Sequence, residues 1–135
     1  MPRFGKRSKE NLETCHEDLQ DLFNEVIKTY DCKVTCGHRG EKDQNKAFKD
    51  GRSKVKFPKG RHNSSPSKAV DVYPYPVNMQ NLDRMIHFAG FVLGKAKSME
   101  INIKWGRDWD SDWYLKDKNK TKFKDYPHFE LIKEF

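Results

Sequence analysis

A single carboxylate within an otherwise apolar stretch constrains this chain more than any other feature. Residues 69–77 read AVDVYPYPV, and Asp71 has apolar residues on both sides. The stretch predicts a buried strand, and its two prolines predict that the strand soon leaves the sheet. A lone ionised acid is costly to bury unless it is paired or binds a metal. The fold must therefore bring a partner to Asp71, and the nearest candidate is His62, which stands before it in a polar loop.

The rest of the chain predicts helices and strands in alternation. Apolar residues spaced three and four apart predict helices over residues 8–30, 41–51 and 81–100. Short apolar stretches predict a strand within residues 31–40 that ends at a glycine-bounded turn, and strands at 69–77, 101–105 and 128–132. Ser8 is placed to cap the first helix, and Val34 and Cys36 are expected to face inward from the first strand. This order indicates a small α+β domain with a mostly antiparallel sheet and flanking helices.

Length and charge limit the class of protein. A chain of 135 residues suits one domain, here residues 1–135. Its 27 Lys and Arg against 20 Asp and Glu give a net charge of +7, which favours a polyanionic partner: nucleic acid, a membrane surface or an anionic cell wall. Charge alone does not choose among these. The three cysteines are an odd number, and reduced thiols are expected.

No apolar stretch follows the basic first residues, MPRFGKRSKEN, and none elsewhere is long enough for a membrane span. We therefore expect no secretory signal and a protein that is kept in a cytosol until it is released.

A second histidine completes a candidate metal site. His128 stands where the final polar loop enters the last strand, and sheet neighbours could bring it to His62 and Asp71. Two imidazoles and a carboxylate are a usual ligand set for catalytic zinc, whose fourth position stays open for water. Asp125, three residues before His128, is placed as a general base for that water. The alternative from spacing alone is that these histidines are ordinary surface residues.

The sequence motifs around these residues resemble those of a known family. The chain carries H-N-x-x-P-S-x-A-V-D-V-x-P-Y-P from His62, then W-G-x-D-W, then D-Y-P-H-F-E. These motifs, over residues 34–131, resemble the phage endolysins that act as L-alanyl-D-glutamate peptidases, relatives of the zinc D-Ala-D-Ala carboxypeptidases. The resemblance implies a hedgehog/DD-peptidase-like fold, zinc held by His62, Asp71 and His128, and Asp125 as the catalytic base. It also implies that Arg39, in CGHR, helps to stabilise the negative oxygen formed during attack.

Three departures from the family pattern concern substrate positioning more than chemistry. Cys36 and His38 stand where the family has a serine and an aromatic residue. Gly60 stands where a serine commonly precedes the first ligand, and Arg107 in WGRDW replaces a glycine. None of them removes a proposed ligand or the base.

The function implied is that of a zinc-dependent endopeptidase that cuts peptidoglycan stem peptides between L-Ala and D-Glu. Such an endolysin degrades the cell wall, lyses the host and is antimicrobial. We expect a monomer that waits in the bacterial cytoplasm and acts at the wall or periplasm once a membrane-permeabilising partner releases it. Lysines 116, 118, 120, 122 and 124 alternate along the chain, which predicts attraction to an anionic wall or membrane surface.

Two other functions stay open at this point. A D-Ala-D-Ala carboxypeptidase of the same fold would use the same motifs, because the choice of bond depends on the shape of the cleft. A basic nucleic-acid-binding module fits the composition. It leaves the order His, Asp, His unexplained, and we therefore expect no nucleic acid partner.

The spacing of cysteines and acids suggests two further candidate metal sites. Cys32 and Cys36 with His38 could form a structural zinc site, against the simpler reading of buried strand thiols. Asp108, Asp110 and Asp112 alternate as in a calcium loop but lack the glycine and closing glutamate of an EF-hand, so a solvated acidic loop is expected. His16 and His87 are expected to be structural or surface residues.

Overall fold

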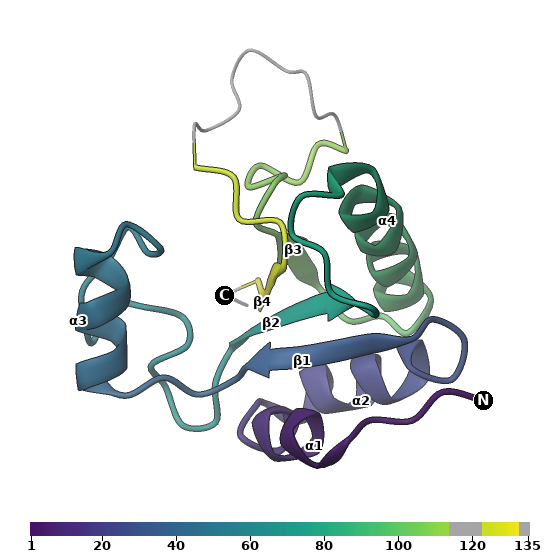
Figure 1. Ribbon diagram of the computed structural model, residues 1–135, viewed down its shortest axis with the longest axis horizontal. Helices are drawn as coiled ribbons and strands as arrows, with labels where there is room; N and C mark the ends of the chain where they lie inside the picture. The colour runs from purple at the N-terminus through teal and green to yellow at the C-terminus, as the bar shows by residue number, and fades with distance from the viewer. Residues whose placement is uncertain (114–122, 133–135) are drawn as a thin grey trace.

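The computed structural model describes residues 1–113 and 123–132 and arranges them around one antiparallel sheet (Figure 1). The helices are α1 (Lys6–Glu13), α2 (Glu17–Val26), α3 (Glu41–Lys49) and α4 (Leu82–Ser98). The strands are β1 (Cys32–Cys36), β2 (Ala69–Pro74), β3 (Ile103–Trp105) and β4 (His128–Leu131), in the order β1-β2-β4-β3. All three strand pairs are antiparallel, which confirms the predicted α+β class.

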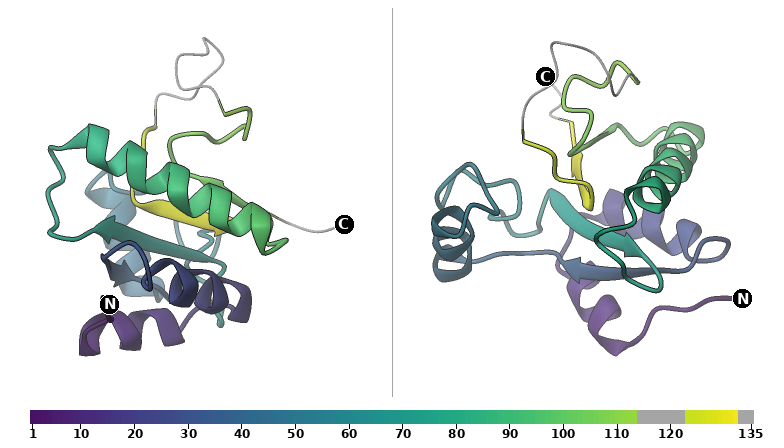
Figure 2. Two further views of the ribbon diagram at one scale, coloured as in Figure 1. Left: turned by 90° about the vertical axis from the view of Figure 1, so that its right-hand side faces the viewer. Right: turned by 45° about the horizontal axis from the view of Figure 1, so that its top comes forward.

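The hydrophobic core lies between one face of the sheet and two helices. Phe129 of β4 contacts Phe23 of α2 and Phe88 of α4, with ring centroids 5.7 and 6.3 Å away. Val70 stands opposite Phe129 in the β2–β4 register and is fully buried on the same face. Figure 2 shows α4 lying across the sheet, while α1 contacts β1. Since side chains alternate along a strand, the residues next to Val70 and Phe129 point to the opposite face.

The first predicted helix is wrong in its extent, because the structure divides it into α1 and α2. Between them, Thr14 and His16 form a short backbone pairing with Ser67: Ser67 N donates to Thr14 O at 2.9 Å and His16 N donates to Ser67 O at 2.7 Å. His16 then caps α2 by accepting from Asp18 N at 3.0 Å. The apolar spacing continues across this break, so periodicity alone could not reveal it.

Ser8 is not the cap that the sequence predicted. Gly5 is the residue before α1, and Ser8 lies buried within the helix. Its hydroxyl accepts a hydrogen bond from Val34 N at 3.1 Å, which joins α1 to the edge strand β1.

Helix α3 stands apart from the sheet (Figure 1), carried by the connections on either side of it, residues 37–40 and 50–68. The second of these is the predicted loop, and it holds His62. No helix among the residues described combines the length and apolar character needed to cross a membrane.

Candidate metal centre

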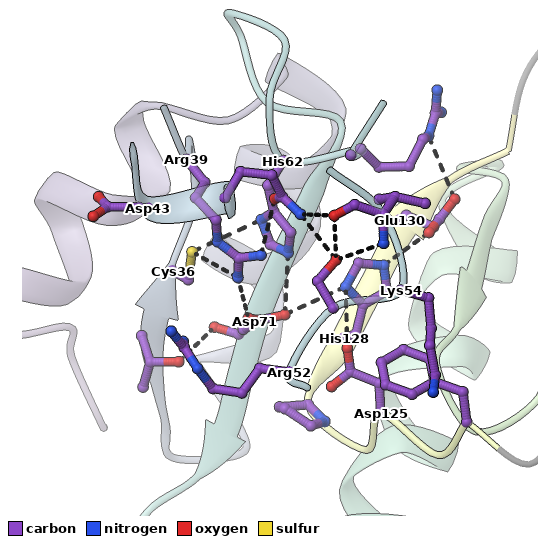
Figure 3. A pocket seen from close by; sticks show the side chains of 18 of the residues that line it. Cys36, Arg39, Asp43, Arg52, Lys54, His62, Asp71, Asp125, His128 and Glu130 are labelled. Atoms are coloured by element: carbon purple, nitrogen blue, oxygen red, sulfur yellow. Dashed lines mark hydrogen bonds and ion pairs between the residues drawn. The ribbon is translucent and has the colours of Figure 1, made fainter. Parts of the chain in front are cut away.

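The pairing of β2 with β4 brings two predicted site residues together on the face of the sheet opposite the core. Asp71 stands directly across from His128 in this register. His62 reaches the same place from the loop, which is tied down by two backbone hydrogen bonds: Lys68 N to Arg61 O at 3.1 Å and Arg39 N to His62 O at 2.8 Å. The three side chains converge in Figure 3.

Within this trio, the distances from Asp71 to each histidine fit ligands of a tetrahedral metal. Ligand atoms within 4.8 Å of one another form two groups that share Asp71, one with His62 and Cys36 and the other with His128 and Asp125. Asp71 Oδ1 lies 3.3 Å from His62 Nε2 and 3.4 Å from His128 Nδ1. Nitrogen and oxygen ligands about 2.0–2.1 Å from a tetrahedral zinc ion lie about 3.3 Å from one another. His62 Nε2 and Asp71 Oδ1 are buried and have no hydrogen-bond partner. Buried polar atoms without a partner are rare and costly, and a metal between these atoms would satisfy both.

Hydrogen bonds set the tautomers of both histidines. His62 Nδ1 lies 2.7 Å from the carbonyl oxygen of Gly37, which only accepts, so this nitrogen carries the proton. His128 Nε2 lies 2.8 Å from Glu130 Oε1 and donates to it. The lone pairs of His62 Nε2 and His128 Nδ1 are therefore left facing Asp71. Partners of this kind orient the ligands in known metal sites.

Sequence reasoning missed the two residues that support His128. Glu130 is buried, and its second oxygen lies 3.4 Å from Arg61 Nε. Arg61 also donates to Leu131 O at 2.7 Å, which fixes its own position. A signal for Glu130 was present, because an acid two residues after His128 in a strand shares its face of the sheet.

Asp125 lies beside the trio at the end of the loop that precedes β4. Its Oδ2 is 3.8 Å from His128 Nδ1, and His128 N donates to Asp125 O at 3.1 Å. Burial, followed by the charge of Asp71, raises the pKa of Asp125 to about 6, although His128 opposes the shift. A carboxyl group with such a pKa takes up and releases protons near neutral pH.

The trio itself is held together by charge. Burial alone would raise the pKa of Asp71, but His62 and His128 hold it well below its usual range. Burial lowers the pKa of both histidines, but interactions with Asp71 outweigh it, and the pKa rises to about 10 for His62 and about 9 for His128. Without a metal ion the three groups thus stabilise one another's charged forms. A bound metal would take the place of the ring protons that face Asp71.

Arg39 lies on the other side of Asp71, in the connection between β1 and α3. Its Nη2 is 3.5 Å from Asp71 Oδ2 and 3.6 Å from Cys36 Sγ, while Nη1 donates to Gln44 Oε1 at 3.1 Å. The structure therefore brings a guanidinium group to the edge of the candidate metal centre.

An open cleft of about 1210 Å³ lies over these residues, between α3 with its following loop and the sheet. Trp109 forms part of its wall: the indole packs on His128 with centroids 5.4 Å apart and stacks on Phe123 at 6.1 Å. Lys54 Nζ lies 5.3 Å from the centroid of the Phe123 ring and extends this wall. The cleft is large enough for an extended peptide, and basic side chains lie around it: Arg39, Lys46, Arg52, Lys54, Lys59, Arg61 and Lys124.

The structure does not assemble the separate cysteine site. Cys36 falls within 4.8 Å of ligand atoms of His62 and Asp71, whereas Cys32 and His38 join no metal-binding group among the residues described. Cys32 is buried, and burial raises the pKa of its thiol to about 12. The reading of Cys32 as a buried strand thiol therefore fits better than a structural zinc site.

The three carboxylates of the acidic loop lie close together, as their alternating spacing suggested. Ligand oxygens of Asp108, Asp110 and Asp112 lie within 4.8 Å of one another, and Asp108 Oδ2 accepts from Trp113 N at 2.9 Å. Acidic groups of this kind commonly gather without an ion.

Of the other residues singled out in the sequence, two histidines have structural contacts and most of the alternating lysines lie outside the described residues. His16 caps α2, and His87 Nδ1 lies 2.8 Å from the hydroxyl of Tyr30. Lysines 116, 118, 120 and 122 lie outside the described residues, while Lys124 lines the cleft.

Comparison with known proteins gives a family and a similar solved structure. The sequence pattern of the family described as phage L-alanyl-D-glutamate peptidase matches residues 1–132. The crystal structure of the Serratia marcescens L-Ala D-Glu endopeptidase ChiX is similar, with a TM-score of 0.73 and 26% sequence identity. The similarity covers 97% of this chain and 91% of that one. No curated protein sequence matches significantly.

Proposed function

This chain belongs to the phage L-alanyl-D-glutamate peptidase family, and we propose that it cuts peptidoglycan stem peptides between L-Ala and D-Glu as a zinc endopeptidase. It is a peptidase that acts on peptidoglycan, as its family and its structural relative indicate. The observation that carries the metal-dependent mechanism is the pair of buried atoms without partners, His62 Nε2 and Asp71 Oδ1, facing each other at 3.3 Å.

His62 Nε2, Asp71 Oδ1 and His128 Nδ1 would hold the zinc ion, with Gly37 O and Glu130 fixing the two rings. Bound there, zinc would supply an activated water and positive charge for the oxyanion that forms at the scissile carbonyl. A donor set of two imidazoles and one carboxylate leaves a position open for that chemistry.

Asp125 acts as the general base in this proposal. Its carboxylate stands beside His128 at the edge of the trio, where it can accept a proton from the attacking water at Oδ2. The same oxygen then gives that proton to the leaving amine of D-Glu. Arg39 is held within 3.5 Å of Asp71 by charge, so its guanidinium can stabilise the negative oxygen.

We further propose the biological setting of an endolysin. Residues 1–135 act as a single catalytic domain and as a monomer. The enzyme waits in the host cytoplasm and degrades the wall after release, which lyses the host and makes the protein antimicrobial. The excess of positive charge, +7 over the chain, supports attraction to the anionic wall or to a membrane surface.

The test is mass analysis of purified peptidoglycan after digestion by the protein, with and without a zinc chelator. We expect new amino termini at D-Glu that disappear with chelator and return with added zinc. Asp125→Ala should abolish them while retaining zinc. Asp21→Ala, a change at an exposed acid of α2, is the matched control and should leave digestion unchanged.

Three results would contradict the proposal. Loss of terminal D-Ala alone would assign a carboxypeptidase of the same fold. An Asp125→Ala variant with normal turnover would remove that residue from the role of base. Untouched peptidoglycan under zinc-replete conditions would reject the peptidase function.

A further inference from the structure

Gln44 is a buried amide that nothing in the proposed mechanism requires. It lies in α3 with 1% of its surface exposed, in a helix whose only other buried residue is Ala47. Its Nε2 donates to Ser53 Oγ at 2.8 Å and to Val55 O at 2.7 Å. Its Oε1 accepts from Arg39 and Asn63 at 3.1 and 3.0 Å. A buried amide so fully bonded is rigidly held.

These contacts tie the outlying helix α3 to the candidate metal centre. Asn63, the neighbour of His62, also donates to Arg39 O at 2.9 Å, and Arg39 N donates to His62 O at 2.8 Å. Arg39 is thus held at its backbone by the segment that carries His62, and at its guanidinium Nη1 by Gln44. Figure 3 shows the Arg39 side chain running from this side of the cleft towards Asp71.

Gln44 restrains a rotation of the Arg39 guanidinium that the ion pair with Asp71 leaves free. Asp71 Oδ2 lies 3.5 Å and Cys36 Sγ 3.6 Å from Nη2 of Arg39, and the guanidinium could still turn about these contacts to a single nitrogen. The hydrogen bond from Nη1 to Gln44 Oε1 restrains the second nitrogen and so orients the plane of the group. A guanidinium is effective for oxyanions when its donors are oriented in advance.

Because Gly60 has no side chain, the amide of Gln44 can lie close to its backbone. A Cβ at this position would lie 2.6 Å from Asn63 Oδ1 and 2.8 Å from Gln44 Oε1. Both oxygens are held by hydrogen bonds, Asn63 Oδ1 by Gly60 N at 2.7 Å and Gln44 Oε1 by Arg39. Gly60 does not have the left-handed backbone that favours glycine, so the reason for glycine here is space.

We propose that Gln44 is a positioning residue that orients the Arg39 guanidinium for the reaction, and that Gly60 keeps the room it needs. The inference rests on the role proposed for Arg39 in the peptidase. It assigns a functional reason to a buried side chain of α3 and to the glycine that replaces the expected serine.

The test is a double-mutant cycle on a soluble muropeptide. Gln44→Met should lower kcat about 10- to 100-fold, the usual effect of losing such a supporting partner. KM should change less than about threefold, since the interaction matters mainly in the transition state. In the Arg39→Met background, adding Gln44→Met should lower kcat by less than about twofold, because the residue through which Gln44 acts is already absent.

Two further variants separate positioning from folding. Gln44→Glu keeps an acceptor for Arg39 but loses the donor to Ser53 Oγ and Val55 O, so it should recover part of the kcat lost in Gln44→Met. Gly60→Ala should lower kcat only where Arg39 is present. Asn45→Ala is the matched control, because exposed Asn45 also fastens the following loop, through Phe57 N at 3.1 Å, but does not contact Arg39. It should keep the kcat of the parent protein.

Zinc content and melting temperature are measured for every variant, and Gln44→Met should bind one zinc ion per chain, as the parent does. Equal losses of kcat from Gln44→Met in both backgrounds would overturn the inference, because they would indicate a purely structural role. A normal kcat in Gln44→Met would also overturn it. A normal kcat in Arg39→Met would reject the role of Arg39 and the inference with it, while a parent protein that cuts no peptidoglycan would reject the peptidase itself.

Discussion

Glu130 holds the His128 ring with Nδ1 turned towards Asp71, because Nε2 donates to Glu130 Oε1 at 2.8 Å. Glu130→Gln removes the charge that strengthens this hydrogen bond and the ion pair with Arg61 at 3.4 Å. We expect zinc affinity to fall about 10- to 100-fold, as for other carboxylates that support a ligating histidine. Competition with a chromogenic chelator measures the affinity.

The matched control for Glu130→Gln is Glu10→Gln, a change at an exposed acid of α1 that pairs with Lys6 at 3.9 Å. It should leave zinc affinity unchanged. If Glu130→Gln binds zinc as tightly as the parent protein, the carboxylate has no part in holding His128.

The three thiols should differ in reactivity. Burial raises the pKa of Cys15 and Cys32 to about 12, whereas Cys36 is half-buried and lines the cleft. A raised pKa keeps a thiol protonated, so at pH 8 only about one in ten thousand of the buried thiols is the reactive thiolate. Iodoacetamide should therefore alkylate Cys36 first, and the other two only after unfolding, as peptide mass mapping would show. Similar labelling of all three in the folded protein would contradict this.

At the scale of single residues, metal chemistry led from the sequence to a trio that the structure does bring together. Asp71 could be singled out because a lone acid in an apolar strand needs a partner, and the histidines because they flank strands. Arg39 came only from family resemblance, since nothing local marks it. Gln44 was missed because its role comes from contacts across the fold, such as that with Asn63, which lies 19 positions away. Glu130 was missed although its place two residues after His128 puts it on the same face of the strand.

Among the elements, α1 packs closely on the connection that leaves β1. A Cβ at Gly37 would lie 2.2 Å from Asn11 O and 2.3 Å from Thr14 Oγ1, and the first of these is backbone at the end of α1. Gly37→Ala must therefore displace α1 from β1, and we expect a loss of roughly 1–3 kcal/mol in the free energy of unfolding. Urea denaturation followed by circular dichroism measures it.

Gly40→Ala is the matched control three residues on, because a Cβ there would meet nothing within 4 Å and its φ is −78°. We expect a change within about 0.5 kcal/mol, as for other substitutions on an open surface. If the two variants are equally stable, α1 does not pack against the backbone at Gly37 as closely as the distances to Asn11 O and Thr14 Oγ1 indicate.

The elements themselves were largely predictable, for reasons visible in particular segments. Helix α4 keeps its apolar spacing from Leu82 to Ser98, and Asn81 caps it by accepting from Arg84 N at 3.2 Å. The break at residues 14–16 was not predictable, because Ser67, its pairing partner, lies about fifty residues further along the chain. The local sequence pattern predicts the extent of a helix or strand well only where no distant segment forms hydrogen bonds with its backbone.

For the molecule as a whole, the order β1-β2-β4-β3 places the last strand in the interior of the sheet. His128 meets Asp71 only because β4 inserts between β2 and β3, and no local feature of the sequence specifies that insertion. The need of Asp71 for a partner made the meeting plausible from chemistry, whereas the strand order that produces it had to come from the structure.

The net charge of +7 and the basic side chains around the cleft lead to a last prediction, about the physical state of the substrate. Attraction to an extended anionic wall acts over many charges and is screened within about 10 Å at 0.1 M salt and about 3 Å at 1 M. We therefore expect the digestion rate of intact sacculi to fall several-fold between about 0.05 and 0.5 M NaCl. The rate on a short soluble muropeptide at saturating concentration should stay nearly constant, because the bond-breaking residues are at least half-buried and are screened less than exposed charges. A double change of exposed cleft lysines, Lys46→Gln with Lys54→Gln, should weaken the salt dependence on sacculi. If both substrates respond equally to salt, the charge acts at the catalytic step and not in attraction to the wall.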